Sequence, residues 1–189
     1  MMRYLIAIPL PESDSTSFIK LRDSFRHYAP RWKLTLGPHI TINRPQDSLV
    51  PCEMAIELFS NAPISPSFKM QFSKVEAFIG KRNSAVYFEP ESHLPFNNIK
   101  SLYQPIADKI VKSGDEGWAF HPHLTLINRL RSEPAQEALN ELAHIQSSEA
   151  SAFKDFSYLL DRVCLYKKEN SDEIWHEIAQ NSLSVSNAT

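Results

Sequence analysis

The sequence predicts a chain of mixed strands and helices that consists of two similar halves. The pattern His-x-Thr-x occurs twice, as Pro-His-Ile-Thr-Ile-Asn-Arg over 38–44 and as His-Pro-His-Leu-Thr-Leu-Ile-Asn over 121–128, and 123 minus 39 gives an offset of 84 between the motif histidines. In both halves the expected order is strand, helix, motif strand, short helix and long strand. A matched order of elements is harder to obtain by chance than a short motif, so the repeat indicates an internal duplication.

The first half follows from apolar periodicity and turn residues. Its expected elements are a buried strand at 4–8, a helix from Ser13 or Asp14 to about Tyr28, the motif strand at 36–43 closed by Arg44-Pro45, a short helix at 53–60 after Pro51, and a long strand at 67–79. In the long strand the alternation of apolar residues slips near Lys74, which indicates a β-bulge.

The second half begins after a hairpin turn at 80–83. Its expected elements are a strand at 85–89, a helix at 93–112 that Pro105 should kink or split, a loop containing Gly114 and Gly117, the motif strand at 121–128, a helix at 134–144, strands at 153–166 and 173–178, and a polar end. Because a hairpin joins the halves, we expect one two-lobed domain over 1–189, with lobes at about 1–80 and 81–180 and a polar tail at 181–189.

Composition limits the function classes. The 189 residues carry a net charge of -2, which argues against a general nucleic-acid coat but allows a locally held phosphate. Cys52 and Cys164 have no zinc-like spacing, so we expect reduced thiols in a cytoplasmic protein, with a disulfide as the weaker interpretation. The apolar run 4–10 is interrupted by Pro9 and is read as a strand, not a signal peptide, and no run is long enough for a membrane span.

The motif strands predict a polar cleft. Alternation places His39, Thr41 and Asn43 on one face, with Ile40 and Ile42 on the other. In the second copy, His123 and Thr125 share a face with His121 and Ile127, while Leu124 and Leu126 face the core.

The chemistry of these residues suits in-line phosphodiester cleavage. Histidine exchanges protons near neutral pH, so His39 and His123 could divide the roles of base and acid. Thr41 and Thr125 offer hydroxyl donors to phosphate oxygens. Arg44 and Arg129 follow the motifs and could neutralise a phosphate, although strict alternation would point Arg44 away from the cleft.

The paired motifs, His39/Thr41 and His123/Thr125, in a duplicated chain of this length resemble the two-histidine phosphoesterase superfamily, also called 2'-5' RNA ligase-like or LigT-like proteins. The resemblance spans roughly Arg3 to Ile178. It implies an α+β fold of two lobes with antiparallel sheets flanked by helices, related by a pseudo-two-fold axis around a central cleft.

The resemblance also implies an activity and a partner. The activity would be hydrolysis of a 2',3'-cyclic phosphate or related phosphodiester of an RNA end or nucleotide, without cofactor or metal, and in some members 2'-5' RNA ligation. The catalytic roles would transfer to His39, Thr41, His123 and Thr125. No obligate protein partner is indicated.

Other interpretations remain open. A non-catalytic module that binds an RNA end or nucleotide would keep the same cleft. His121 and His123 could instead supply two ligands of a catalytic metal, although no third ligand is suggested and Gly37 stands at the equivalent position of the first copy. A histidine-triad hydrolase is disfavoured because Thr125 stands where its third histidine would be. The histidines without companion motifs are expected to be solvated, and these are His27, His93, His144 and His176.

Aromatic and basic residues add candidates for nucleotide contacts. Phe120, Tyr166 and Trp118 could stack on a base, although core positions are the more common role of such residues. Two basic pairs, Lys81-Arg82 and Lys167-Lys168, could guide a phosphate chain or simply be solvated turns.

Overall fold

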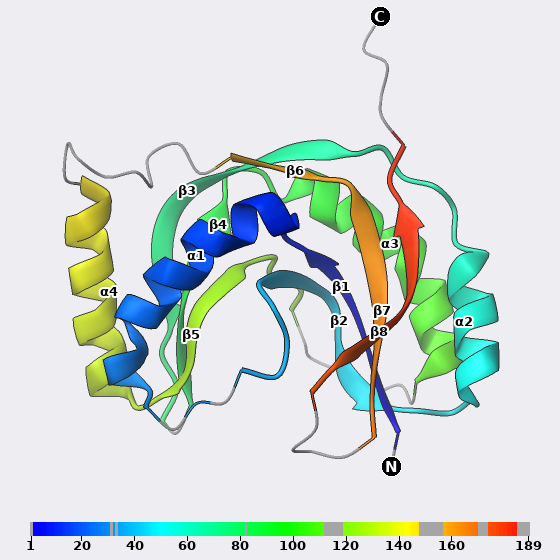
Figure 1. The fold of residues 1–189 in the computed structure, drawn as a ribbon, viewed down its shortest axis with the longest axis horizontal. Coiled ribbons are helices and arrows are strands. Elements are labelled where there is room, and N and C mark those ends of the chain that lie inside the picture. The colour runs from blue at the N-terminus through cyan, green and yellow to red at the C-terminus, as the bar shows by residue number, and fades with distance from the viewer. Residues whose placement is uncertain are drawn as a thin grey trace, which may run out of the picture.

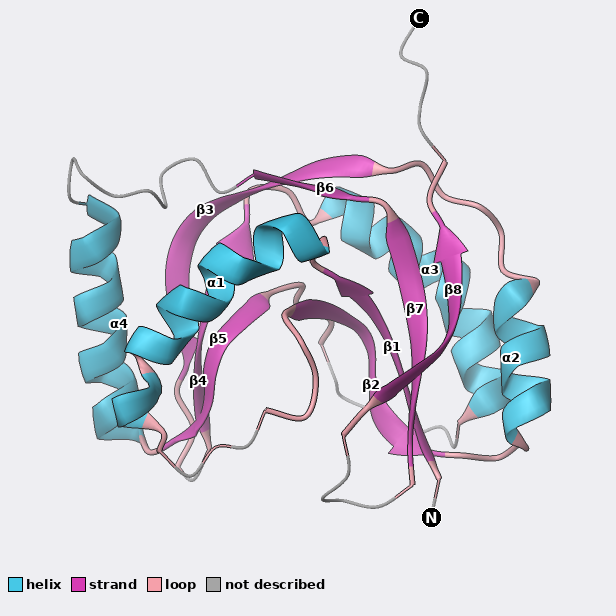
Figure 2. Ribbon diagram, in the orientation of Figure 1, coloured by secondary structure: helices cyan, strands magenta, loops and turns pink. Residues whose placement is uncertain are grey.

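Eight strands form one curled antiparallel sheet, and four α-helices cover its outer side (Figures 1 and 2). The computed structural model describes residues 2–30, 32, 34–81, 83–111, 119–147, 157–169 and 174–184, and these counts refer to that part of the chain. The strand order is β6-β3-β4-β5-β2-β1-β7-β8. The strands are β1 (Arg3–Pro9), β2 (His39–Asp47), β3 (Phe68–Phe78), β4 (Ser84–Pro90), β5 (Leu124–Leu130), β6 (Ser157–Leu160), β7 (Arg162–Lys168) and β8 (His176–Ser182).

The helices lie in two pairs. The first pair, α1 (Glu12–Ser24) and α4 (Ser132–Ser147), covers the side of β3 and β4, and a 3-10 turn, η1 (Arg26–Tyr28), follows α1. The second pair, α2 (Cys52–Ser60) and α3 (Leu94–Ile110), packs against β2 and β8. In Figure 1 the two pairs stand at opposite sides of the curled sheet. The α+β class and the antiparallel sheet with flanking helices are therefore confirmed.

Most expected elements are present, with shifted ends. The bulge expected near Lys74 is confirmed, because the pairing of β3 with β4 slips between Phe72 and Lys74. The turn before β4 requires glycine at position 80, since a Cβ there would lie 2.5 Å from the carbonyl oxygen of Asn83. The expected strand at 153–166 is divided into β6 and β7 at Asp161, and its residues 153–156 lie outside the described residues, as do 112–118 of the expected helix end and loop.

Neither of two prolines ends its element. Pro105, which was expected to kink or split its helix, does not split α3, which runs continuously from Leu94 to Ile110. Pro105 is exposed, so the carbonyl that loses its helical partner can be hydrated. Pro45 does not close the first motif strand, since β2 continues to Asp47. There the Arg3 Nη2 donates to the Pro45 carbonyl at 3.0 Å.

The pairing of the strands shows an internal two-fold relation. At the centre of the sheet Ile40 of β2 pairs with Leu124 of β5, and 124 minus 40 gives the same offset of 84 that relates the motif histidines. The register of β1 with β2 is repeated in that of β4 with β5: Ala7 opposite Thr41 corresponds to Tyr87 opposite Thr125. The predicted duplication therefore relates the backbone pairing as well as the motifs.

Each half of the sheet contains strands from both halves of the sequence. β3 follows α2 but pairs with β4, and β7 follows α4 and β6 but pairs with β1. Each half of the sequence also supplies a helix that packs on strands of the other half. Phe18 of α1 packs edge-on against Phe88 of β4, and α3 contacts β2. The lobe boundary near residue 80 thus stays a prediction about the sequence repeat.

The sheet has an apolar layer on each side. The larger core includes residues of both motif strands, such as Ile40, Ile42, Leu124 and Leu126, and most of the buried helix residues. A smaller cluster on the inner face consists of Leu5, Ala7, Cys164 and Tyr166, with Leu36 and Trp175 packed against it. This small cluster forms the base on which the polar inner face is built. In the described part of the chain, no helix is both long and apolar enough to cross a membrane.

Candidate active site

The two motif histidines are held in the same way by the backbone. The Nδ1 of His39 lies 2.7 Å from the Gly37 carbonyl oxygen, and the Nδ1 of His123 lies 2.7 Å from the His121 carbonyl oxygen. A carbonyl can only accept a hydrogen bond, so each Nδ1 carries its proton. In the neutral rings, Nε2 is therefore the nitrogen that can accept a proton, and both rings line the same cleft of about 490 Å³.

Burial lowers the pKa of both motif histidines. Burial lowers the pKa of His39 below its ordinary value, and the hydrogen bond to Gly37 partly opposes this shift. Burial also lowers the pKa of His123, against the hydrogen bond to the His121 carbonyl, and the charges that His121 and His39 can carry lower it further. Both imidazoles line the same cleft, so one substrate could contact both of them.

Thr41 and Thr125 line the cleft beside the histidines. Each is half-buried and lies two residues after its histidine on the same face of its strand. The Thr hydroxyls come from β2 and β5, the central pair of strands, so the four motif side chains meet where the two-fold relation brings the strands together.

A β-bulge after each threonine reverses the alternation of side chains. Between the pair Ala7–Thr41 and the pair Ile6–Asn43, the pairing advances by one residue in β1 and by two in β2. The pairs Tyr87–Thr125 and Val86–Ile127 show the same slip between β4 and β5. The expectation that Asn43 and Ile127 share the motif face was therefore wrong. Both are buried on the helix side, where Asn43 accepts a hydrogen bond from Lys100 of α3 at 3.3 Å and Ile127 joins the main core.

The reversal brings Arg44 and its equivalent, Asn128, to the cleft, so the outward direction expected for Arg44 was wrong. Arg129 also lines the cleft. Arg129 has a φ of 62°, in the left-handed region that is unfavourable for residues other than glycine, and its N–H donates to Asn128 Oδ1 at 2.7 Å. The role of both arginines in binding phosphate stays a prediction.

A second group of cleft residues includes Arg3 and Trp175, which sequence reasoning missed, and Lys168, which it named only as part of a basic pair. Arg3 of β1 is directly opposite Lys168 of β7, and both line the cleft together with Trp175. The Lys168 Nζ lies 5.4 Å from the centre of the Trp175 ring. Among the described residues that line the cleft there are four Arg and Lys side chains and no carboxylate, although the chain as a whole is slightly acidic. The cleft is thus suited to an anion.

The aromatic residues considered for base stacking and the basic residues considered for guiding a phosphate chain do not form one group. Phe120 is half-buried against the main core, with Lys100 Nζ 5.8 Å from its ring centre, and Tyr166 is buried in the inner cluster. Trp118 and Arg82 lie outside the described residues, and Lys167 forms an ion pair with Glu169 at 2.9 Å. A stacking role for Phe120 or Tyr166 stays a prediction.

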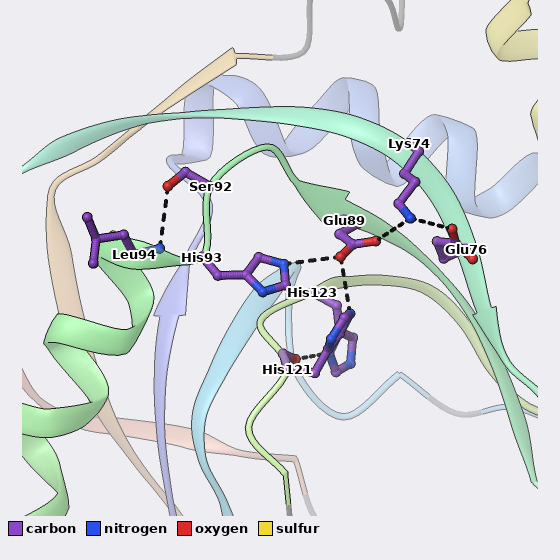
Figure 3. Close-up of polar contacts among 8 residues, drawn as sticks. All are labelled: Lys74, Glu76, Glu89, Ser92, His93, Leu94, His121 and His123. Carbon is purple, nitrogen blue, oxygen red and sulfur yellow. Dashed lines mark hydrogen bonds and ion pairs between the residues drawn. The ribbon is translucent and has the colours of Figure 1, made fainter.

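His121 contacts residues outside the cleft. Its Nε2 lies 3.7 Å from Glu89 Oε1, and His93 Nε2 lies 3.2 Å from the same oxygen (Figure 3). Among the described residues, the group that could hold a metal ion consists of Glu89, His93 and His121 and does not include His123. The expectation that His93 is simply solvated was therefore wrong. Cys52 and Cys164 both carry free thiols, so the weaker disulfide interpretation is not realised.

Comparison with protein families decides the relationship. The model of the 2'-5' RNA ligase superfamily matches residues 10–172, which include both motifs. The chain belongs to the 2'-5' RNA ligase superfamily. The expected resemblance to the two-histidine phosphoesterases is confirmed. Comparison with curated protein sequences finds no match.

Solved structures of this superfamily share the fold. LigT of Escherichia coli in complex with phosphate is 19% identical, with a TM-score of 0.62 and coverage of 97% of this chain and 98% of LigT. The LigT complex with 3'-AMP is 18% identical, with a TM-score of 0.63 and coverage of 96% and 98%. The protein TT0787 of Thermus thermophilus is 16% identical, with a TM-score of 0.61 and coverage of 97% and 99%. At this identity the structures establish the superfamily fold of the chain.

Proposed function

We propose that the protein is a metal-independent phosphoesterase that hydrolyses 2',3'-cyclic phosphates or related phosphodiesters of RNA ends or nucleotides. The observation that carries the proposal is the matched pair of histidines. Each Nδ1 is bound to a backbone carbonyl, and both rings line one cleft. A carbonyl partner fixes the tautomer without adding a charge, so each Nε2 can act as a base when neutral and as an acid when protonated.

The mechanism is an in-line displacement at phosphorus. The neutral histidine removes a proton from water as its oxygen attacks phosphorus. The bond from phosphorus to one ribose oxygen breaks on the opposite side, and the protonated histidine gives its proton to that oxygen. One P–O bond forms and one breaks, and the product is a nucleoside phosphomonoester. The proton states of His39 and His123 are exchanged at the end of the reaction and re-equilibrate with solvent.

Hydroxyl and cationic groups would stabilise the charge on the phosphate. Thr41 and Thr125 would donate hydrogen bonds to the non-bridging oxygens, and Arg44 and Arg129 would offset the charge that develops on them. The absence of carboxylates among the described cleft residues supports this assignment, because a carboxylate would repel the substrate.

Nucleotides are the substrate class that the relatives support. LigT has been solved with phosphate, with 3'-AMP and with ATP, so a relative of the same fold binds phosphates and nucleotides. A cleft of about 490 Å³ is within the range of small-molecule sites, which is roughly 300–1,000 Å³. The same acid and base would also serve 2'-5' ligation, with a terminal ribose hydroxyl in place of water as the nucleophile.

One experiment tests the proposal. Protein treated with a chelator is incubated with each 2',3'-cyclic nucleotide and with an oligonucleotide that ends in a cyclic phosphate, and the phosphomonoester products are identified. We expect cleavage in the presence of chelator. Saturable binding without turnover on every substrate would instead support the binding module, and activity that chelator abolishes and Zn²⁺ restores would support a metal hydrolase.

A further inference from the structure

Glu89, His93 and His121 converge from three elements beside the candidate active site. Glu89 is near the end of β4, His93 is the residue before α3, and His121 lies shortly before β5. One ligand atom from each residue lies within 4.8 Å of the other two. Figure 3 shows the two imidazoles pointing toward the same carboxylate oxygen. None of the three residues lines the cleft that contains His39 and His123.

The distances match those of a zinc site. Ligands placed tetrahedrally about 2.1 Å from Zn²⁺ lie about 3.4 Å from one another. The two distances from Glu89 Oε1, 3.2 Å to His93 Nε2 and 3.7 Å to His121 Nε2, fall on either side of that value. Two imidazoles and one carboxylate are a ligand set that zinc uses in proteins.

His121 Nε2 provides a second observation. This atom is buried, and among the described residues it has no hydrogen-bond partner. A buried polar atom without a partner is unusual in a native protein and indicates a ligand or an ordered water. The side chains of His93 and His121 are 34% and 33% exposed, so solvent can reach the group and a water can complete the coordination.

The charges around the group also fit a cation. Lys74 Nζ binds the other carboxylate oxygen, Glu89 Oε2, at 3.3 Å, so Oε1 remains directed at the imidazoles. The positive charge of Lys74 is offset by Glu76, whose Oε1 lies 2.7 Å from the same ammonium. Lys74 thus acts as a partner that orients the ligand, a common feature of metal sites.

We propose that Glu89, His93 and His121 bind one divalent cation of the zinc class outside the catalytic cleft. The ion joins the end of β4, the start of α3 and the segment that leads into β5. It therefore stabilises the position of His121, whose carbonyl holds His123. This proposal does not depend on the proposed phosphoesterase activity, and the ion takes no part in that reaction.

The test is a titration of chelator-treated, dialysed protein with Zn²⁺, followed by isothermal calorimetry. We expect saturable binding of one Zn²⁺ per chain, weakened at least about tenfold in Glu89→Gln and in His93→Ala. His144→Ala removes an exposed histidine of α4 and is the matched control, so its affinity should equal that of the unaltered protein. Circular dichroism establishes that each variant is folded.

A second readout separates site binding from surface binding. Zn²⁺ should raise the Tm of the unaltered protein and of His144→Ala, because a ligand that binds only the folded state stabilises it, and should leave the Tm of Glu89→Gln nearly unchanged. Equal affinity in Glu89→Gln and the unaltered protein would overturn the proposal, as would the lack of saturable one-to-one binding. Neither readout uses phosphoesterase activity, so failure here leaves the proposed function standing.

Discussion

The two half-sites use identical backbone geometry but differ in the residue that holds the histidine. Gly37 and His121 are equivalent positions, since 121 minus 37 gives 84, and each offers its carbonyl to the Nδ1 of the histidine two residues later. Among the described residues, apart from its chain neighbours, no atom lies within 4 Å of the place where Gly37 would carry a Cβ, whereas the side chain of His121 reaches Glu89. Because the backbone carbonyl holds the histidine in both halves, the side chain at this position can take another role. Only the second half has such a side chain, the imidazole of His121.

Loss of either imidazole should have the largest effect if the half-sites share the reaction. We expect His39→Ala and His123→Ala each to lower kcat by about 10²- to 10⁴-fold, because each removes one of the two proton transfers. The double variant should be little worse than either single one, since the groups act together. Single-turnover rates on a 2',3'-cyclic nucleotide measure this, with His144→Ala as control. Full activity in either single variant would end the symmetric mechanism.

The threonines test whether both halves bind the phosphate in the transition state. Thr41→Val and Thr125→Val keep the shape of the strand and remove one hydroxyl donor. We expect kcat to fall by roughly 10²-fold in each, because such a donor acts mainly on developing charge. An unchanged kcat with a raised KM in one variant would show that its half binds the substrate without contributing to the chemical step.

The two half-sites differ in the residue that follows the bulge. Asn128 is the position equivalent to Arg44, and in the second half the positive charge is on the next residue, Arg129. We expect Arg129→Gly to raise KM through loss of that charge, and to raise the free energy of unfolding by about 1 kcal/mol, because glycine accepts a φ of 62° more readily. Urea denaturation and steady-state kinetics measure the two effects. Arg44→Ala, which has no such conformation, should raise KM without the gain in stability.

The pH dependence of the reaction should show the smallest effect, but it reports most directly on the surroundings of His39 and His123. Burial lowers the pKa of both His39 and His123 below the ordinary histidine value. The acid must be protonated, so kcat/KM should fall as pH rises through these lowered values, and its maximum should lie on the acid side of about pH 6.5. An anionic substrate favours protonated histidine, so the kcat profile should lie at higher pH. A maximum of kcat/KM above pH 8 would contradict the assigned environments.

The sequence predicted the central four side chains because two-residue periodicity is a local property of a strand. His39 and Thr41 lie before the bulge in β2, where alternation holds, and the same is true of their counterparts in β5. The direction of Arg44 could not be predicted in this way, since the bulge arises from pairing with a distant strand. An apolar residue on the expected polar face, Ile127, is the local signal that could have indicated such a bulge in β5.

Contacts between residues that distant pairing brings together were missed for the same reason. Arg3 and Lys168 become neighbours through the register of β1 with β7, which no local pattern in either segment specifies. In the sequence His93 has no companion motif, because Glu89 lies before it on the other side of a turn. His121 comes close to both residues only through the pairing of β4 with β5. Apart from the cleft between the duplicated motif strands, the sequence therefore predicted what lies within one strand and not which distant residues become neighbours.

The exchange of β3 and β7 has a consequence for how the molecule could come apart. Each half of the repeat supplies the strand that flanks the first strand of the other half, and each also supplies a helix that covers the other's sheet. The arrangement is that of a domain-swapped dimer whose two subunits have been fused into one chain. Cleavage at the Gly80 hairpin would therefore leave two fragments that each lack a sheet neighbour, and only together could they rebuild the eight-stranded structure.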